Sequence, residues 1–94
     1  MGELHYGTQA VFQVDDRVLA HLERVILAKL RRNEGFALAL DDAKGGRDTM
    51  WLHAASAVRF HYDGELPPIN RAWLEVLIDA ANGAGGLRVL PEPT

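Results

Sequence analysis

The alternation of hydrophobic and polar residues along the chain predicts a set of short β-strands. Alternation with a period of two is the signature of a strand that buries one face. The expected strands are residues 3–14, which form a hairpin, and residues 36–40, 48–53, 58–62 and 87–90. Gly45 and Gly46 separate two of these strands and favour a second hairpin turn, because glycine adopts positive φ without strain.

Hydrophobic residues spaced three or four apart predict two amphipathic helices. The first covers residues 15–35, with Asp15 as the expected N-cap and Gly35 as the stop signal. Its apolar positions are Val18, Leu19, Leu22, Val25, Ile26 and Leu30. The second covers residues 71–83 after the expected N-cap Asn70, and its apolar positions are Trp73, Leu74, Leu77, Ile78 and Ala81.

The resulting element order, ββαβββαβ, separates the helices from the strand meanders and is typical of the α+β class. We therefore expect a single domain over residues 1–94. Its architecture is predicted to be one mostly antiparallel sheet that carries both helices on one face. Residues 91–94, with the sequence Pro-Glu-Pro-Thr, are expected to be a tail.

Composition narrows the classes of function. With 94 residues, 48% hydrophobic and 24% charged, the chain has the composition of an ordinary globular domain. It has no cysteine, so disulfides and thiolate metal sites are excluded. No apolar segment approaches the ~20 residues that span a bilayer, and no signal peptide is recognisable. We expect a cytoplasmic protein without a membrane partner, and the net charge of −3 argues against a protein that coats nucleic acid.

Residues 61–66, His-Tyr-Asp-Gly-Glu-Leu, echo the Lys-Tyr-Asp-Gly motif of ATP-dependent DNA ligases, whose lysine amine attacks the nucleotide. A histidine stands in place of that lysine, and the surrounding ligase domain is missing. Asp-Gly after an alternating strand is a common turn signal. We expect a turn at Asp63-Gly64, with no catalytic residue and no cofactor.

Four segments carry a resemblance that runs along the whole chain. They are DDRVLAHLERVILAKLRR, WLH, PPINRAWLEVL, and the final GGL with LPEP. These segments are similar to a family of small bacterial proteins of roughly a hundred residues, often labelled ATP-dependent DNA ligases although they lack the ligase catalytic domain. The resemblance implies an accessory, DNA ligase-associated domain of unknown function, and it transfers no catalytic residue to this chain.

Four histidines and thirteen carboxylates raise the question of a metal site. The histidines, His5, His21, His53 and His61, lie on different predicted elements without the spacing of a ligand pair. If residues 48–53 and 58–62 form a hairpin, His53 lies opposite Val58 and points away from the side of His61. No metal site is expected.

Basic residues near the end of the first helix suggest an alternative function. Arg24, Lys29, Arg31, Arg32 and Arg47 could form one stripe. Such a stripe would support a nucleic-acid-binding accessory domain associated with DNA repair or ligation. Cations also complement the dipole at a helix C-terminus, so the pattern leaves both interpretations open.

The faces of the predicted sheet favour self-association. We assign Phe36, Leu38, Leu40, Trp51, Phe60, Tyr62, Leu87 and Val89 to the face that meets the helices. The opposite face then collects Val11, Ala37, Ala39, Met50, Leu52 and Leu90 beside His5, Gln13, Arg59 and His61. An uncovered face of this kind usually marks an interface.

We therefore expect a homodimer through this face, with Met50 and Leu52 buried at the contact. The alternative is a monomer in which the loops cover the face. The predicted function is a non-enzymatic interaction module that acts through self-association and an unidentified protein partner.

Overall fold

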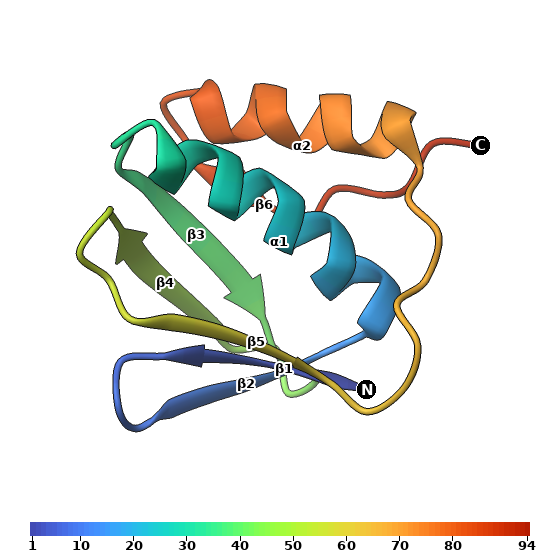
Figure 1. Ribbon diagram of the computed structural model, residues 1–94, viewed down its shortest axis with the longest axis horizontal. Helices are drawn as coiled ribbons and strands as arrows, with labels where there is room; N and C mark the ends of the chain where they lie inside the picture. Colours follow the sequence, from blue (N-terminus) through green and yellow to red (C-terminus); the bar gives the residue numbers. More distant parts are fainter.

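The computed structural model describes residues 1–94 and has the expected α+β organisation. Its elements are β1 (Gly2–Tyr6), β2 (Ala10–Val14), α1 (Asp16–Arg31), β3 (Phe36–Asp41), β4 (Arg47–Leu52), β5 (Val58–Tyr62), α2 (Arg71–Asn82) and β6 (Leu87–Arg88). The predicted order ββαβββαβ is confirmed. Both helices lie on one side of the strands (Figure 1). Neither helix has the length and apolar composition needed to cross a bilayer.

The strands form two three-stranded sheets, so the prediction of a single sheet was wrong. Sheet A has the order β2-β1-β5 and is antiparallel throughout. Sheet B has the order β4-β3-β6, in which β3 pairs antiparallel with β4 and parallel with β6. Helix α1 contacts β1 and β5, whereas α2 contacts β3 and β6. Each sheet therefore has its own covering helix.

The expected hairpin between β4 and β5 is absent, because β5 pairs with β1 instead. The connecting segment turns back on itself at its start. The Ser56 N–H donates to the His53 carbonyl at 2.8 Å, and the His53 N–H donates to the Ser56 hydroxyl oxygen at 3.0 Å. Near this segment, one hydrogen bond links the two sheets: the Tyr6 hydroxyl donates to the Trp51 carbonyl at 2.8 Å.

The helices begin where the sequence predicts. Asp15 accepts hydrogen bonds from the backbone N–H groups of Arg17 and Val18, and Asn70 caps α2 in the same way. The end of α1 differs from the prediction. Gly35 was the predicted stop signal, but α1 ends at Arg31, and Asn33, with a φ of 58°, adopts the left-handed conformation after it. Asparagine tolerates this conformation better than most residues.

The core lies between the helices and the two sheets. Its buried members include the predicted residues Leu19, Leu22, Val25, Ile26, Phe36, Leu38, Leu40, Trp73, Leu77, Ala81 and Leu87. Phe60 and Tyr62 are partly buried against this core, as predicted. Ile78 is exposed, so the apolar stripe of α2 is narrower than the sequence suggested.

The predicted faces of β4 were wrong. Leu52 pairs with Phe36, and Trp51 pairs with Ala37. Because cross-strand partners project to the same face, Leu52 shares the core face with Phe36, and Met50 lies two residues away on that face. Leu52 is 1% and Met50 7% exposed, whereas Trp51 is 59% exposed. Met50 and Leu52 therefore cannot form the contact of a homodimer.

The residues assigned to one open face are divided between the outer faces of two sheets. On sheet A, the cross-strand pairs place Val11, Gln13, Arg59 and His61 on the face of Glu3 and His5, away from the core residue Leu4. On sheet B, Ala37 and Ala39 share a face with Trp51. At the C-terminal end, Val89 is exposed and Leu90 packs against the core, the reverse of the prediction.

Candidate functional site

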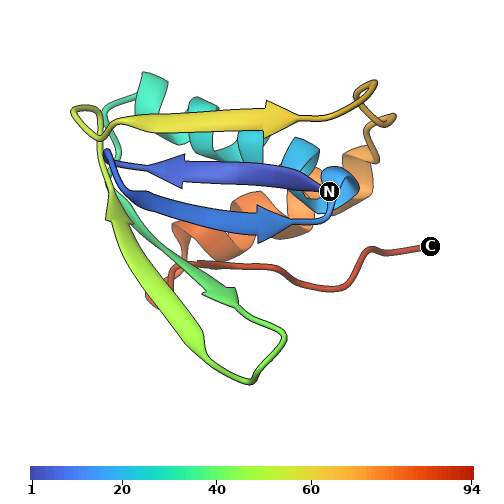
Figure 2. The ribbon, with the colours of Figure 1, turned by 90° about the horizontal axis from the view of Figure 1, so that it is seen from below.

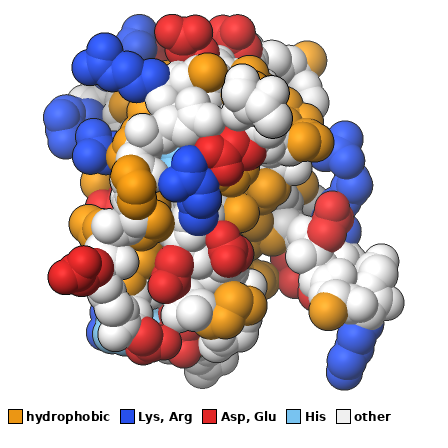
Figure 3. Space-filling model, turned by 90° about the vertical axis from the view of Figure 1, so that its right-hand side faces the viewer, with side chains coloured by type: hydrophobic (Ala, Val, Ile, Leu, Met, Phe, Trp, Pro, Cys, Tyr) orange, Lys and Arg blue, Asp and Glu red, His pale blue; other side chains and the backbone are white.

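A cleft of about 680 Å³ lies where the two sheets splay apart. Figure 2 shows strand β2 on one side and the β3–β4 hairpin diverging from it on the other. Figure 3 views the molecule from the right-hand side of Figure 1 and shows hydrophobic side chains in a hollow, with acidic side chains among those around it. The cleft continues the hydrophobic core toward solvent, because sheet B diverges from sheet A there and leaves the core uncovered.

The floor of the cleft is apolar. It is formed by Phe12 and Val14 of β2, Val18 of α1, Leu40 of β3, and Val89 after β6. Val14 and Leu40 belong to the buried core, and Phe12 and Val18 pack against it. An apolar ligand group placed here would therefore extend the packing of the core.

The rim of the cleft carries four carboxylates and no lysine or arginine. Asp15 caps α1, and Asp42 accepts hydrogen bonds from the N–H groups of Lys44 and Gly46 within its own hairpin. Asp41 forms an ion pair with Arg47 at 3.0 Å. The side chain of the fourth, Asp48, forms no hydrogen bond and no ion pair within the protein, so it is the rim carboxylate that is free to bind a ligand.

Strand β2 presents an unpaired backbone edge. The N–H of Gly7 donates to the carbonyl of Ala57, so the backbone of β1 points toward β5 at this residue. Backbone groups alternate in direction along an antiparallel strand, so the even-numbered residues of β1 bond to β2. Their partners are Ala10, Phe12 and Val14. Val11 and Gln13 consequently direct their N–H and C=O groups outward, away from β1 and along the edge bordering the cleft.

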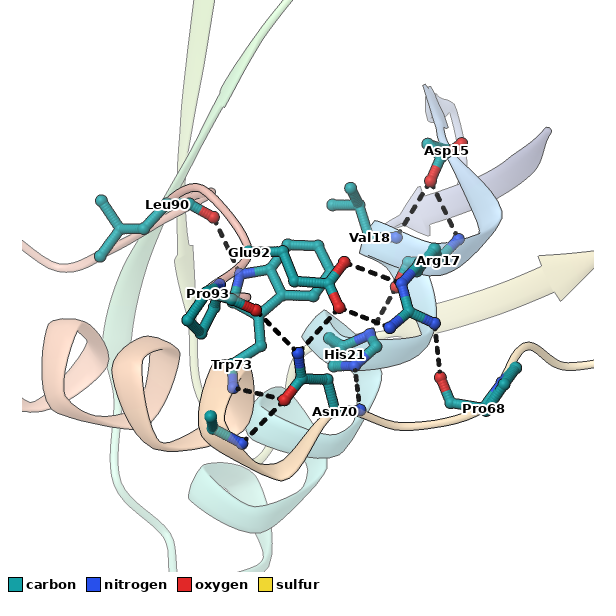
Figure 4. A network of polar contacts seen from close by, with 11 residues as sticks. Asp15, Arg17, Val18, His21, Pro68, Asn70, Trp73, Leu90, Glu92 and Pro93 are labelled. Atoms are coloured by element: carbon teal, nitrogen blue, oxygen red, sulfur yellow. Dashed lines mark hydrogen bonds and ion pairs between the residues drawn. The ribbon is translucent and has the colours of Figure 1, made fainter.

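Val89, the first residue after β6, lines the cleft, and polar contacts hold the segment that follows it in place (Figure 4). The Trp73 indole Nε1 donates to the Leu90 carbonyl at 2.8 Å. The carboxylate of Glu92 accepts two hydrogen bonds from the Arg17 guanidinium, one of them at 2.8 Å, and one from Asn70 Nδ2 at 2.9 Å. Residues 91–94 are therefore not the free tail predicted from the sequence.

The ion pair with Arg17 also changes the acidity of Glu92. Hydrogen bonds from Arg17, and then from Asn70, lower the pKa of Glu92 to about 2. The same contact with Glu92 raises the pKa of Arg17. Both groups thus remain charged over the neutral pH range.

His21 completes this network as a structural residue. Its ring is fully buried and lies 4.5 Å from the Trp73 ring, centroid to centroid. The backbone N–H of Asn70 donates to His21 Nε2 at 2.8 Å, so Nδ1 carries the proton and donates to the Arg17 carbonyl at 2.6 Å. Both nitrogens are satisfied within the protein, and neither is available to a ligand.

Comparison with protein families gives one result. The model of a family described as a domain of unknown function, DUF7882, matches residues 1–92. The chain belongs to the DUF7882 family. The family description contains nothing that refers to ligases, so the ligase association inferred from the sequence stays a prediction. No curated protein and no solved structure matches the chain significantly.

In this DUF7882 chain the five predicted basic residues do not form one stripe. Lys29 is buried, and its ammonium contacts Asn82 at 2.7 Å and Glu34 at 3.2 Å. Arg32 also pairs with Glu34. Arg47 bonds to Asp41, the last residue of β3, which lies at the opposite end of the strand from the basic C-terminus of α1. Arg24 and Arg31 are exposed and form no ion pair.

The segment that echoes the ligase motif forms the end of a strand, followed by a bend at Asp63-Gly64 as predicted. His61 lies on the outer face of sheet A, with Nε2 3.3 Å from an Asp63 carboxylate oxygen. His5 lies on the same face and bonds to Glu3 at 3.0 Å. The DUF7882 fold brings together no three histidine, aspartate or glutamate residues that could hold a metal ion.

Sequence reasoning missed the cleft and its free carboxylate. The signal was present in the alternation of β4, where Asp48, Met50 and Leu52 occupy every second position. Once Met50 and Leu52 are placed on the core face, Asp48 must lie on that face too. A charged residue there identifies the place where the core opens to solvent.

Proposed function

We propose that this DUF7882 chain is a non-enzymatic interaction module that holds an extended segment of a partner protein in the cleft between its sheets. The observation that carries the proposal is the coincidence of an apolar floor with the unpaired edge of β2. Extended peptides commonly bind to exposed sheet edges, where backbone hydrogen bonds provide affinity and side-chain pockets provide specificity.

The chemistry of the lining supports binding in preference to catalysis. Besides aspartates, the only polar residue that lines the cleft is Gln13, whose side chain projects to the outer face of sheet A, and no serine, histidine or lysine lines it. Three of the four carboxylates already accept hydrogen bonds or form an ion pair. This lining offers no nucleophile with an adjacent base.

A selection from a display library of random peptides tests this function. Peptides selected on the wild-type chain should lose binding to Val89→Asp, which puts a charge into the apolar floor. Val76→Asp is the matched control, because Val76 is similarly exposed but lies on α2. If no selected peptide distinguishes these two variants, the cleft is not the binding site and the proposal fails.

Self-association is a second proposal, with Trp51 as its supporting observation. Its side chain is 59% exposed on the outer face of sheet B, and tryptophan is enriched among the residues that dominate protein interfaces. Asp41 and Arg47 form an ion pair on the same face. A two-fold-related second copy would present the same pair and could match both signs of charge.

Light scattering over a range of protein concentrations tests self-association. We expect a dimeric mass for the wild-type chain and a monomeric mass for Trp51→Arg. Ile78→Arg is the control, because Ile78 is exposed on α2 at 37%. A monomeric wild-type chain at every concentration, or a Trp51→Arg chain that stays dimeric, would remove this face as the interface.

A further inference from the structure

We infer that the segment held in the cleft is cationic, with alternating basic and apolar residues, and that it binds as an additional strand on the free edge of β2. This inference rests on the proposed function and specifies the chemistry of its partner. Three features carry it: the direction of the β2 backbone groups, the position of the apolar floor and the charge of the rim.

The backbone of β2 can pair with one further strand. Val11 and Gln13 direct their N–H and C=O groups outward, as the register with β1 requires. On the other side of the cleft, β3 already has β4 and β6 as neighbours. The outer strands of sheet B, β4 and β6, contribute only Asp48 of β4 to the lining, whereas β2 contributes the consecutive residues Phe12, Gln13 and Val14. A segment in the cleft would therefore lie along the edge of β2, and the five residues Ala10–Val14 set its approximate length.

An added strand would present its side chains to two different environments. Residues on the side of Phe12 and Val14 would enter the apolar floor, and residues on the side of Val11 and Gln13 would remain on the outer face. Because successive side chains of a strand point to opposite faces, the bound segment needs apolar residues at every second position. The positions between them are free to be polar or charged.

The charge of the rim selects the polar residues of the segment. Four carboxylates and no lysine or arginine line the cleft, and the whole chain carries a net charge of −3. The one cationic group among the lining residues is the N-terminal ammonium of Met1, which lies 3.7 Å from an Asp16 carboxylate oxygen. Lysine or arginine side chains on the bound segment would complement this rim, where the Asp48 carboxylate has no partner within the protein. An acidic peptide or a nucleic-acid backbone would meet repulsion, and so would a second copy of this chain docked through the same edge.

The test uses fluorescence anisotropy with labelled peptides of about eight residues, long enough to cover the edge of β2. The first peptide alternates lysine and valine, the second alternates glutamate and valine, and the third has the first composition in blocks of lysine and valine. We expect binding of the first peptide only. Raising the salt from about 50 mM to about 300 mM should weaken this binding about fivefold, because the rim charges are exposed and screened.

Variants of the protein separate charge from backbone pairing. Asp48→Lys should weaken binding of the lysine peptide about fivefold or more, because an attraction becomes a repulsion. Asp79→Lys is the control, because Asp79 is an exposed acid on α2. Gln13→Pro should weaken binding about tenfold by removing an outward N–H, whereas Gln13→Ala should not.

Peptide variants test strand addition without any change to the protein. The lysine peptide is N-methylated at every second residue, in either of the two possible registers. Methylation in the register whose N–H groups face β2 should abolish binding, and methylation in the other register should leave it within about twofold. This comparison of methylated peptides still tests strand addition if the Gln13→Pro variant does not fold.

The outcomes distinguish this inference from the proposed function. Equal binding of the lysine and glutamate peptides, or equal effects of the two methylation registers, would overturn the inference. If the peptides that bind the wild-type chain still fail to bind Val89→Asp, the cleft binds a segment of different chemistry and the proposed function stands. Sensitivity to Asp48→Lys together with one methylation register is the result that supports the inference.

Discussion

The indole Nε1 of Trp73 donates a 2.8 Å hydrogen bond to the carbonyl oxygen of Leu90, and this bond fastens the C-terminal segment to helix α2. Leu90 follows Val89, which lines the cleft, and precedes Glu92, which bonds to Arg17. The core residue that anchors α2 thus also positions one wall of the candidate site. Changes in this network should affect both stability and binding.

Replacement of Trp73 with phenylalanine should destabilise the protein. The change retains an aromatic ring in the core but removes the hydrogen bond to Leu90, at a cost of about 1–2 kcal/mol in the free energy of unfolding. Urea denaturation measures this cost. Trp51→Phe is the control, and its effect should lie within about 0.5 kcal/mol because Trp51 is exposed. Equal effects of the two changes would contradict the assigned roles.

The corrected faces of β4 predict opposite outcomes for adjacent residues. Leu52→Ala removes a fully buried side chain and should lower the free energy of unfolding by about 2–5 kcal/mol. Trp51→Ala removes a larger but exposed side chain and should cost less than about 1 kcal/mol. Thermal or urea unfolding of the two variants decides the matter. A larger loss at Trp51 would restore the original assignment of faces.

Glu92 should make stability depend on pH under acid conditions. Its folded-state pKa of about 2 lies below the ordinary value of 4.5, so the folded state favours the charged carboxylate. The resulting stabilisation is fully present above pH 4.5 and is lost as the pH falls toward 2. Urea unfolding at several pH values should show this decline. Glu92→Gln should show a smaller decline over the same interval, and an identical decline would exclude the contribution of this group.

Two adjacent glycines should respond differently to alanine. Gly86 has a φ of 80°, and an added Cβ would lie 2.7 Å from the Ala37 carbonyl oxygen. Gly85 has no atom within 4 Å of such a Cβ. Gly86→Ala should cost at least about 1 kcal/mol of stability and displace β6, whereas Gly85→Ala should be close to neutral. Equal melting temperatures for the two variants would contradict the close approach of β6 to β3.

DNA binding can be measured with short intact and nicked duplexes. The acidic rim and the pairing of three of the five predicted basic residues lead us to expect no binding at moderate salt. Binding with a steep salt dependence, lost on replacement of Arg24 and Arg31, would favour the nucleic-acid alternative. Arg59→Ala is the control and should leave any such binding unchanged, because Arg59 lies on the outer face of sheet A and not on helix α1.

Much of the local structure could be predicted from the sequence. The N-caps Asp15 and Asn70, the turn around Gly45 and the bend at Gly64 each depend on residues that are adjacent in the chain. Such short-range preferences are visible in the sequence. The element order follows from these signals, and it is confirmed.

The arrangement of the strands could not be predicted in the same way. The pairing of β5 with β1 joins segments that are more than fifty residues apart, and no local pattern specifies it. On β4, both alternating sets contain large apolar residues, Met50 and Leu52 in one and Trp51 in the other. Only the register with Phe36 decides which set is buried. The cleft depends on both features, so it was missed.

Amide hydrogen exchange at the edge of β2, followed by NMR, tests the central claim most directly. In the free protein, the Val11 and Gln13 amides should exchange rapidly because they lack a partner, whereas the Phe12 amide should be protected by β1. Saturation with the alternating lysine and valine peptide should protect Val11 and Gln13 and leave Phe12 unchanged. A bound peptide that leaves the exchange of Val11 and Gln13 unaltered would contradict strand addition at this cleft.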